Sequence, residues 1–318
     1  MVNAVLIIKP INEPLSPGDI VGTAFNLLRR NIGFTCKVLL VPTIINALGS
    51  IAIQWALTKP AAMQSIAGMG FLFLLGLLGL IVGLIAKWIL TLRQMALMRM
   101  AGGFSDDWQE AYKTVLDRKW QVVALWILTA IITVAILIAW VVQFYLTTMR
   151  HRNDESVMAF LAGLVLLIIA ISILCFAAFL GLCLIACDKR NFKDTIDRTI
   201  MLISGNFSRC LGFSLALLIT IAILSYPLSM PIALLGVWDT YRLGISHNTN
   251  EMPIHTAIAG HVWESLITLL ISPLFSFAFA VFYVDLLNRK EGLDLRRRLA
   301  AITPVSHEDQ LQNGTEGS

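Results

Sequence analysis

The stretch SVMAFLAGLVLLIIAISILCFAAFLGLCLIAC, residues 156–187, contains no Asp, Glu, Lys or Arg. About 20 apolar residues in a helix are enough to cross the hydrocarbon core of a bilayer, which is roughly 30 Å thick. The stretch therefore predicts a transmembrane helix. Five further segments of at least 20 residues are equally free of these charged residues: Val38–Thr58, Pro60–Ala86, Trp120–Met149, Cys210–Trp238 and Ser265–Val284.

The composition of the whole chain agrees with six spans. Of its 318 residues, 57% are hydrophobic and 14% are charged, and the mean hydropathy is +0.77. Soluble domains carry about 25% charged residues. We therefore expect an all-α integral membrane protein with six transmembrane helices, in which too few residues remain for a soluble catalytic domain.

The distribution of Lys and Arg predicts the orientation, because these residues concentrate in cytoplasmic loops. Eighteen of them lie before the first span, between spans two and three, between spans four and five, and after span six. The intervening segments hold four, at Lys59, Arg150, Arg152 and Arg242. Both termini are expected in the cytoplasm. The basic face, in a chain of net charge +4, is expected to meet anionic lipid headgroups and not nucleic acid.

Three segments of similar design precede spans one, three and five. They read DIVGTAFNLLRRN at residues 19–31, DWQEAYKTVLDRK at 107–119 and DTIDRTIMLISGN at 194–206, with spacings of 88 and 87 residues. Each begins with Asp, which favours a helix N-terminus, and each has amphipathic helical periodicity. The pattern predicts three repeats, each an interfacial helix followed by two spans. The alternative is a short helix packed against the ends of neighbouring spans.

These observations predict the organisation of the chain. Residues 1–14 form a cytoplasmic segment without the apolar run of a cleaved signal peptide. The membrane domain covers residues 15–295, with repeats at about 15–106, 107–193 and 194–295. The tail, 296–318, starts basic and ends in a polar stretch expected to be disordered.

Two motifs carry a resemblance to a known family. One is LSPGDI at residues 15–20, followed by AFNLLRRN at 24–31, and the other is FYVDLLNRKEGLD at 282–294. They resemble the bacterial membrane-domain family named after glycerophosphoryl diester phosphodiesterases, whose closing run typically reads Tyr-Tyr-Asp-Leu-Arg-x-Arg-x-Glu-Gly-Phe-Asp. Val284 and Leu287 depart from the second Tyr and from the Arg of that run. The resemblance implies a bacterial plasma membrane protein but no enzyme, because the family's phosphodiesterase activity belongs to a separate barrel domain.

The polar residues expected on the outer side are candidates for chemistry. They are His151, Asp154, Glu155, Asp239, His247, Glu251, His255, His261 and Glu264. His261 and Glu264 are separated by three positions on one helix, so both project from one face, as in sites for divalent metals. The competing interpretation is ordinary solvated loop residues. We favour the latter, and assign no catalytic, cofactor-binding or metal-binding residue.

Residues inside the spans mostly predict packing. Cys183 and Cys187 lie one turn apart, and without a third ligand they are expected to be small packing residues. Gly79 and Gly83 form a GxxxG spacing, with Gly70 and Gly76 nearby, which favours close approach of helices. Four prolines are expected to kink spans one, five and six around a cavity or lateral cleft: Pro42, Pro227, Pro231 and Pro273.

The functional expectation follows from what is present and absent. A complete membrane architecture, a basic cytoplasmic face and no recognisable catalytic motif favour a non-enzymatic scaffold or accessory subunit of a membrane process, with protein partners in the membrane and no cofactor. The kinked spans favour the alternative, a transporter that handles lipids or other amphiphiles. A third hypothesis is a membrane enzyme or metal site at His261 and Glu264.

Overall fold

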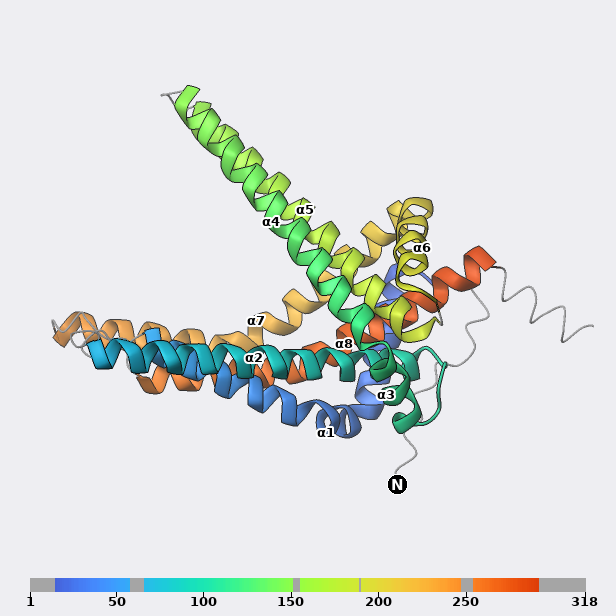
Figure 1. Ribbon diagram of the computed structural model, residues 1–318, viewed down its shortest axis with the longest axis horizontal. Helices are drawn as coiled ribbons and strands as arrows, with labels where there is room; N and C mark the ends of the chain where they lie inside the picture. Colours follow the sequence, from blue (N-terminus) through green and yellow to red (C-terminus); the bar gives the residue numbers. More distant parts are fainter. Residues whose placement is uncertain (1–14, 58–65, 151–154, 189, 247–253, 292–318) are drawn as a thin grey trace, which may run out of the picture.

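The computed structural model describes residues 15–57, 66–150, 155–188, 190–246 and 254–291. Within them the chain is all-helical, with eight helices (Figure 1): α1 (Pro17–Leu57), α2 (Ile66–Ala101), α3 (Trp108–Asp117), α4 (Lys119–Arg150), α5 (Glu155–Cys187), α6 (Phe192–Gly205), α7 (Phe207–Ser246) and α8 (Ile254–Glu291). Six of these are long and apolar enough to cross a membrane, namely α1, α2, α4, α5, α7 and α8. The prediction of six apolar spans is confirmed. The predicted segments 1–14 and 296–318 lie outside the described residues.

A short helical segment precedes three of the spans. The helix α3 precedes α4, α6 precedes α7, and the first part of α1 precedes its second part. The backbone leaves helical geometry at Arg118 (φ −105°, ψ 14°) and at Asn206 (φ −139°, ψ 34°), which end α3 and α6. It does the same inside α1 at Asn31 (φ −120°, ψ 16°). The Nδ2 group of Asn31 donates to the Leu27 carbonyl at 3.0 Å, and that of Asn206 donates to the Leu202 carbonyl at 3.2 Å. These side chains bond carbonyls near the break, as local polar groups do when they compete with the helix ladder.

The three predicted Asp residues do not all begin their helices. Asp107 is the N-cap of α3, and its carboxylate accepts from the Glu110 amide at 3.2 Å. In α1, by contrast, Asp19 lies in the first turn and pairs reciprocally with Ser16, because Ser16 occupies the capping position. Asp194 lies in the first turn of α6, whose N-cap is Asn191. All three Asp residues therefore lie at helix N-termini as predicted, Asp107 as the cap and the other two in the first turn.

The core of the molecule is centred on α8. In the most apolar stretch of each span, 56% of the residues of α8 are buried, against 6% for α5. Figure 1 shows α1, α2, α8 and the second part of α7 running together as one bundle, while the α4–α5 hairpin diverges from it. The two groups meet at the end where α3 and α6 lie, here called the near end; the opposite end of each helix is its far end.

Aromatic packing joins the hairpin to the bundle at the near end. Phe213 of α7 stacks on Phe282 of α8 with ring centroids 4.3 Å apart, and Phe176 of α5 packs edgewise against both. From Leu180 to Cys187 the hairpin is buried. Towards the far end its apolar side chains are exposed, including Ile131 (61%) and Leu166 (63%). The hairpin is therefore attached to the bundle through its near end.

The short helices present apolar residues both to the protein and to the outside. In α3, Ala111 and Val115 are buried, while Leu116 is exposed. In α6, Leu202 is buried, while Ile200 and Met201 are exposed. Packing against the span ends, the alternative interpretation of these segments, accounts for the buried face. Their exposed apolar residues are what an interfacial position would require.

Candidate functional site

Two of the predicted polar residues meet near the far end of the bundle. His261 Nδ1 and Glu264 Oε2, three positions apart on α8, are 3.7 Å from each other. Gln54 of α1 approaches the other side of the imidazole, and its Oε1 contacts His261 Nε2. The site therefore depends on the packing of α1 against α8, which brings together residues 207 positions apart.

A small polar pocket, the α1–α8 pocket, lies beside this pair. Its volume is about 50 Å³. Its lining comes mostly from α1 and α8, with Leu90 from α2: Thr43, Asn46, Ala47, Ser50, Leu90, His261, Glu264, Ser265 and Thr268. A volume of roughly 10–15 Å³ is enough for one water, so the pocket has room for water or an ion.

The sequence holds a signal for this pocket in the spacing of its polar residues. Thr43, Asn46, Ser50 and Gln54 recur at intervals of three or four positions, which places them on one face of a helix. The positions 261, 264, 265, 268 and 272 do the same on α8. Two polar stripes inside apolar spans predict that the stripes face each other, because polar groups in the bilayer need partners within the protein.

The remaining outer candidates do not join this site. Asp239 of α7 is buried and accepts a hydrogen bond from the Thr256 hydroxyl of α8, which forms a separate α7–α8 contact. His151, Asp154, His247 and Glu251 lie outside the described residues, and the side chains of Glu155 and His255 are likewise not described. Among the residues with described side chains, no three or more His, Cys, Asp or Glu gather as metal ligands would.

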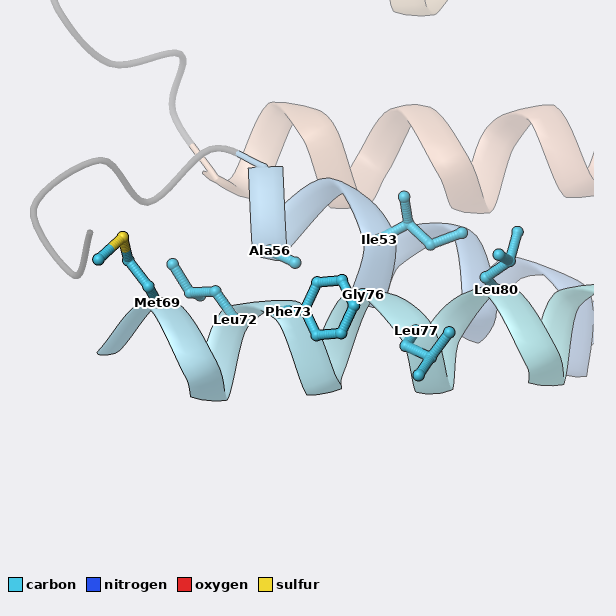
Figure 2. A pocket seen from close by; sticks show the side chains of 8 residues that line it. All are labelled: Ile53, Ala56, Met69, Leu72, Phe73, Gly76, Leu77 and Leu80. Carbon is cyan, nitrogen blue, oxygen red and sulfur yellow. The ribbon is translucent and has the colours of Figure 1, made fainter. Parts of the chain in front are cut away.

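An apolar groove of about 580 Å³ lies between α1 and α2 towards their far ends (Figure 2). Its lining is Ile53, Ala56, Met69, Leu72, Phe73, Gly76, Leu77 and Leu80. The four prolines lie inside α1, α7 and α8 as predicted, and α7 bends part-way along its length (Figure 1). Of the three proline-containing spans that were expected to surround a cavity, α1 lines this groove, while α7 and α8 do not.

The α1–α2 crossing is built from glycines. A Cβ added at Gly79 would lie 2.8 Å from the Gly49 carbonyl oxygen, and one added at Gly49 would lie 2.9 Å from the Gly83 nitrogen. Both distances are below any real contact, so the backbones touch directly. A Cβ at Gly83, in contrast, meets nothing within 4 Å. The GxxxG motif therefore serves close packing, and Gly49 is the partner that sequence analysis missed.

A buried ion-pair network ties both resembling motifs together at the near end. Asp285 is 1% exposed, and its Oδ2 lies 2.7 Å from Arg209 Nη2 and 3.4 Å from Arg289 Nε. The Leu15 amide donates to Asp285 Oδ1 at 3.1 Å, and Arg209 donates to the Leu15 carbonyl. The network thus links the start of α1, the start of α7 and the end of α8. Both carboxylate oxygens of Asp285 are engaged by these protein groups, which indicates a structural role.

Arginines also cap the end of α5. Arg99 donates to the Ala186 carbonyl at 2.9 Å, and Arg118 donates to the Ile185 carbonyl at 2.8 Å. Positive charge at a helix C-terminus is favourable because the last carbonyls lack helical partners. Burial of the guanidinium and, secondarily, the nearby Arg99 charge lower the pKa of Arg118 below its usual value.

Cys183 and Cys187 are both buried at the same end. The Cys183 thiol lies 3.7 Å from the Phe279 carbonyl of α8. Their position within the packed core agrees with the packing role expected for them.

No protein-family model, no curated protein and no solved structure matches this chain.

Proposed function

We propose that this chain is a non-enzymatic, multi-pass protein of the bacterial plasma membrane that acts as a scaffold or accessory subunit. The observation that carries the proposal is the α4–α5 hairpin. Beyond its near end the hairpin diverges from the bundle (Figure 1), and there it presents exposed apolar side chains such as Ile131 and Leu166. A hairpin that stands apart from its own bundle offers a lateral surface for a partner's transmembrane helices.

The topology within this proposal has both termini in the cytoplasm. The excess of Lys and Arg on one side supports it, and so does their location in the structure. Arg99, Arg118, Arg209 and Arg289 all lie at the near end with α3 and α6. The near end would then be the cytoplasmic end, in reach of anionic headgroups.

A threefold repeat is a further part of the proposal. The helical breaks at Asn31, Arg118 and Asn206 are 87 and 88 residues apart, and each separates a short helix from a span. Membership of the membrane-domain family is proposed on the two resembling motifs. The hydrogen bond between Leu15 and Asp285 joins the two motifs directly and supports their treatment as one structural unit.

Photo-crosslinking in native membranes tests the scaffold function. A photoreactive amino acid at Ile131 or Leu166 is expected to yield a discrete protein adduct, because these positions face the surface proposed for the partner. The same probe at Leu78, which is 59% exposed on α2 in the bundle, serves as the control and should give lipid adducts only. Lipid adducts alone at all three positions would contradict the proposal.

Lipid or amphiphile handling is a second candidate, favoured by the apolar groove between α1 and α2. A groove of about 580 Å³ falls in the range of ligand pockets, roughly 300–1,000 Å³, and its apolar lining suits an acyl chain. Native mass spectrometry in mild detergent should detect a retained lipid of defined mass. Leu77→Trp, which fills the groove, is expected to remove it.

The matched control is Leu74→Trp, because Leu74 lies on the same helix, is 64% exposed and does not line the groove. This variant should retain the lipid. If the wild type and both variants carry the same unselective mixture of lipids, the groove is not a specific site.

A further inference from the structure

The α1–α8 pocket is unusual because it places polar side chains between two largely apolar, membrane-length helices. Its polar lining extends from Thr43, which is buried in α1, to His261 near the far end of α8. Ser272, one turn beyond Thr268, has a buried hydroxyl without a hydrogen-bond partner among the described residues, but it does not line the pocket. Burying polar groups without partners is costly, so a bound species that satisfies the polar groups of the lining would stabilise the fold.

Two of the four hydroxyl groups that line the pocket, those of Thr43 and Ser265, are arranged as acceptors. Thr43 donates its hydrogen to the Leu39 carbonyl at 2.8 Å, and Ser265 donates its hydrogen to the His261 carbonyl at 2.7 Å. Each hydroxyl thus spends its hydrogen on its own helix, which leaves oxygen lone pairs for a species in the pocket. Neither Lys nor Arg is among the lining residues. The pocket is therefore suited to a cation and not to an anion.

The charged group of the pocket lies beside His261. Gln54 Oε1 contacts His261 Nε2, and Glu264 Oε2 lies 3.7 Å from His261 Nδ1 on the other side of the ring. Glu264 is the one carboxylate of the pocket lining, and its negative charge is stabilised by positive charge placed close to it.

We infer that the α1–α8 pocket binds one small monovalent cation, for which Na⁺ is the probe. Hard cations take oxygen ligands, and hydroxyl, amide and carboxylate oxygens line this pocket. A volume of about 50 Å³ admits a small ion together with a few waters. The one carboxylate, Glu264, balances one positive charge, which favours a monovalent ion. This inference is independent of the proposed scaffold function.

The test measures the melting temperature of the full-length protein in mild detergent while NaCl replaces choline chloride at constant ionic strength. Binding to the native state raises the melting temperature, and an increase of about 3 °C that saturates with NaCl is expected. The pocket variants Glu264→Gln and Thr268→Val keep the size of the side chain but remove a ligand oxygen or its charge. Each is expected to abolish the increase.

Asp197→Asn is the matched control, since Asp197 is an exposed carboxylate on α6 at the opposite end of the molecule. It should retain the full increase. Far-UV circular dichroism establishes that each variant is folded, and Ser50→Ala replaces any variant that is not. Equal melting temperatures of the wild type in NaCl and choline chloride would overturn the inference. So would an increase that persists in both pocket variants, or one produced by micromolar Zn²⁺ but not by Na⁺.

Discussion

Asp285→Asn is expected to destabilise the protein by about 3–5 kcal/mol, the range for breaking one side of a buried ion pair. Asp285 is 1% exposed and Arg209 has 16% of its side chain exposed, so water screens their interaction only weakly. Without the carboxylate, the Arg209 guanidinium stays buried without its counter-ion. The contacts of Leu15 and Arg289 with Asp285 weaken at the same time.

Thermal unfolding of the detergent-solubilised protein measures this effect. Asp197→Asn, the same substitution at an exposed site, provides the control and is expected to leave the melting temperature within about 1 °C. A double variant, Asp285→Leu with Arg209→Met, should be more stable than Asp285→Asn, because it removes both charges and restores apolar packing. A melting temperature for Asp285→Asn equal to that of the control would show that the network does not hold the three helices together.

Gly79→Ala and Gly49→Ala are each expected to cost about 1–3 kcal/mol, the range for overpacking a closely packed contact. The added methyl group would lie 2.8 Å from a backbone oxygen at Gly79, and 2.9 Å from backbone atoms at Gly49. Backbone atoms of a helix cannot move aside as a flexible side chain can. The two helices must therefore separate along the α1–α2 crossing.

Gly83→Ala is the matched control on α2, since its methyl group meets nothing within 4 Å. Alanine is favoured over glycine in a helix by up to about 1 kcal/mol, so this variant should be as stable as the wild type or more stable. The comparison is made by thermal unfolding of all three variants. Equal changes in melting temperature for Gly79→Ala and Gly83→Ala would mean that the backbones of α1 and α2 do not touch at Gly49.

Local features of the fold could be predicted because they depend on neighbours in the chain. The length of the uncharged segments alone specifies the six apolar helices. Asp107 caps α3 because its carboxylate accepts a hydrogen bond from an amide only three residues away. The i, i+3 spacing of His261 and Glu264 places them on one face in the same way. Asp19 and Asp194 lie in first turns, as their effect on the helix dipole predicts, while Ser16 and Asn191 occupy the capping positions before them.

The candidate site could not be predicted as a whole. His261 was identified as a candidate, but its partner Gln54 lies on a different span, and the two polar stripes acquire meaning only when α1 packs against α8. Gly49 was missed for the same reason. A glycine is a packing residue only where another backbone approaches it, and that approach comes from α2.

By itself, then, the sequence determined that this is an all-helical protein with six membrane-length apolar helices, because hydrophobic length and helix capping act within a few turns of chain. The tertiary structure alone decided which helices meet. It placed α8 at the centre, joined Leu15 to Asp285, opened the α4–α5 hairpin away from the bundle and enclosed a polar pocket between α1 and α8. Because lipid surrounds every span with equally apolar material, the hydropathy of a span does not determine which other spans it packs against. Shape and polar pairing between distant segments make that choice.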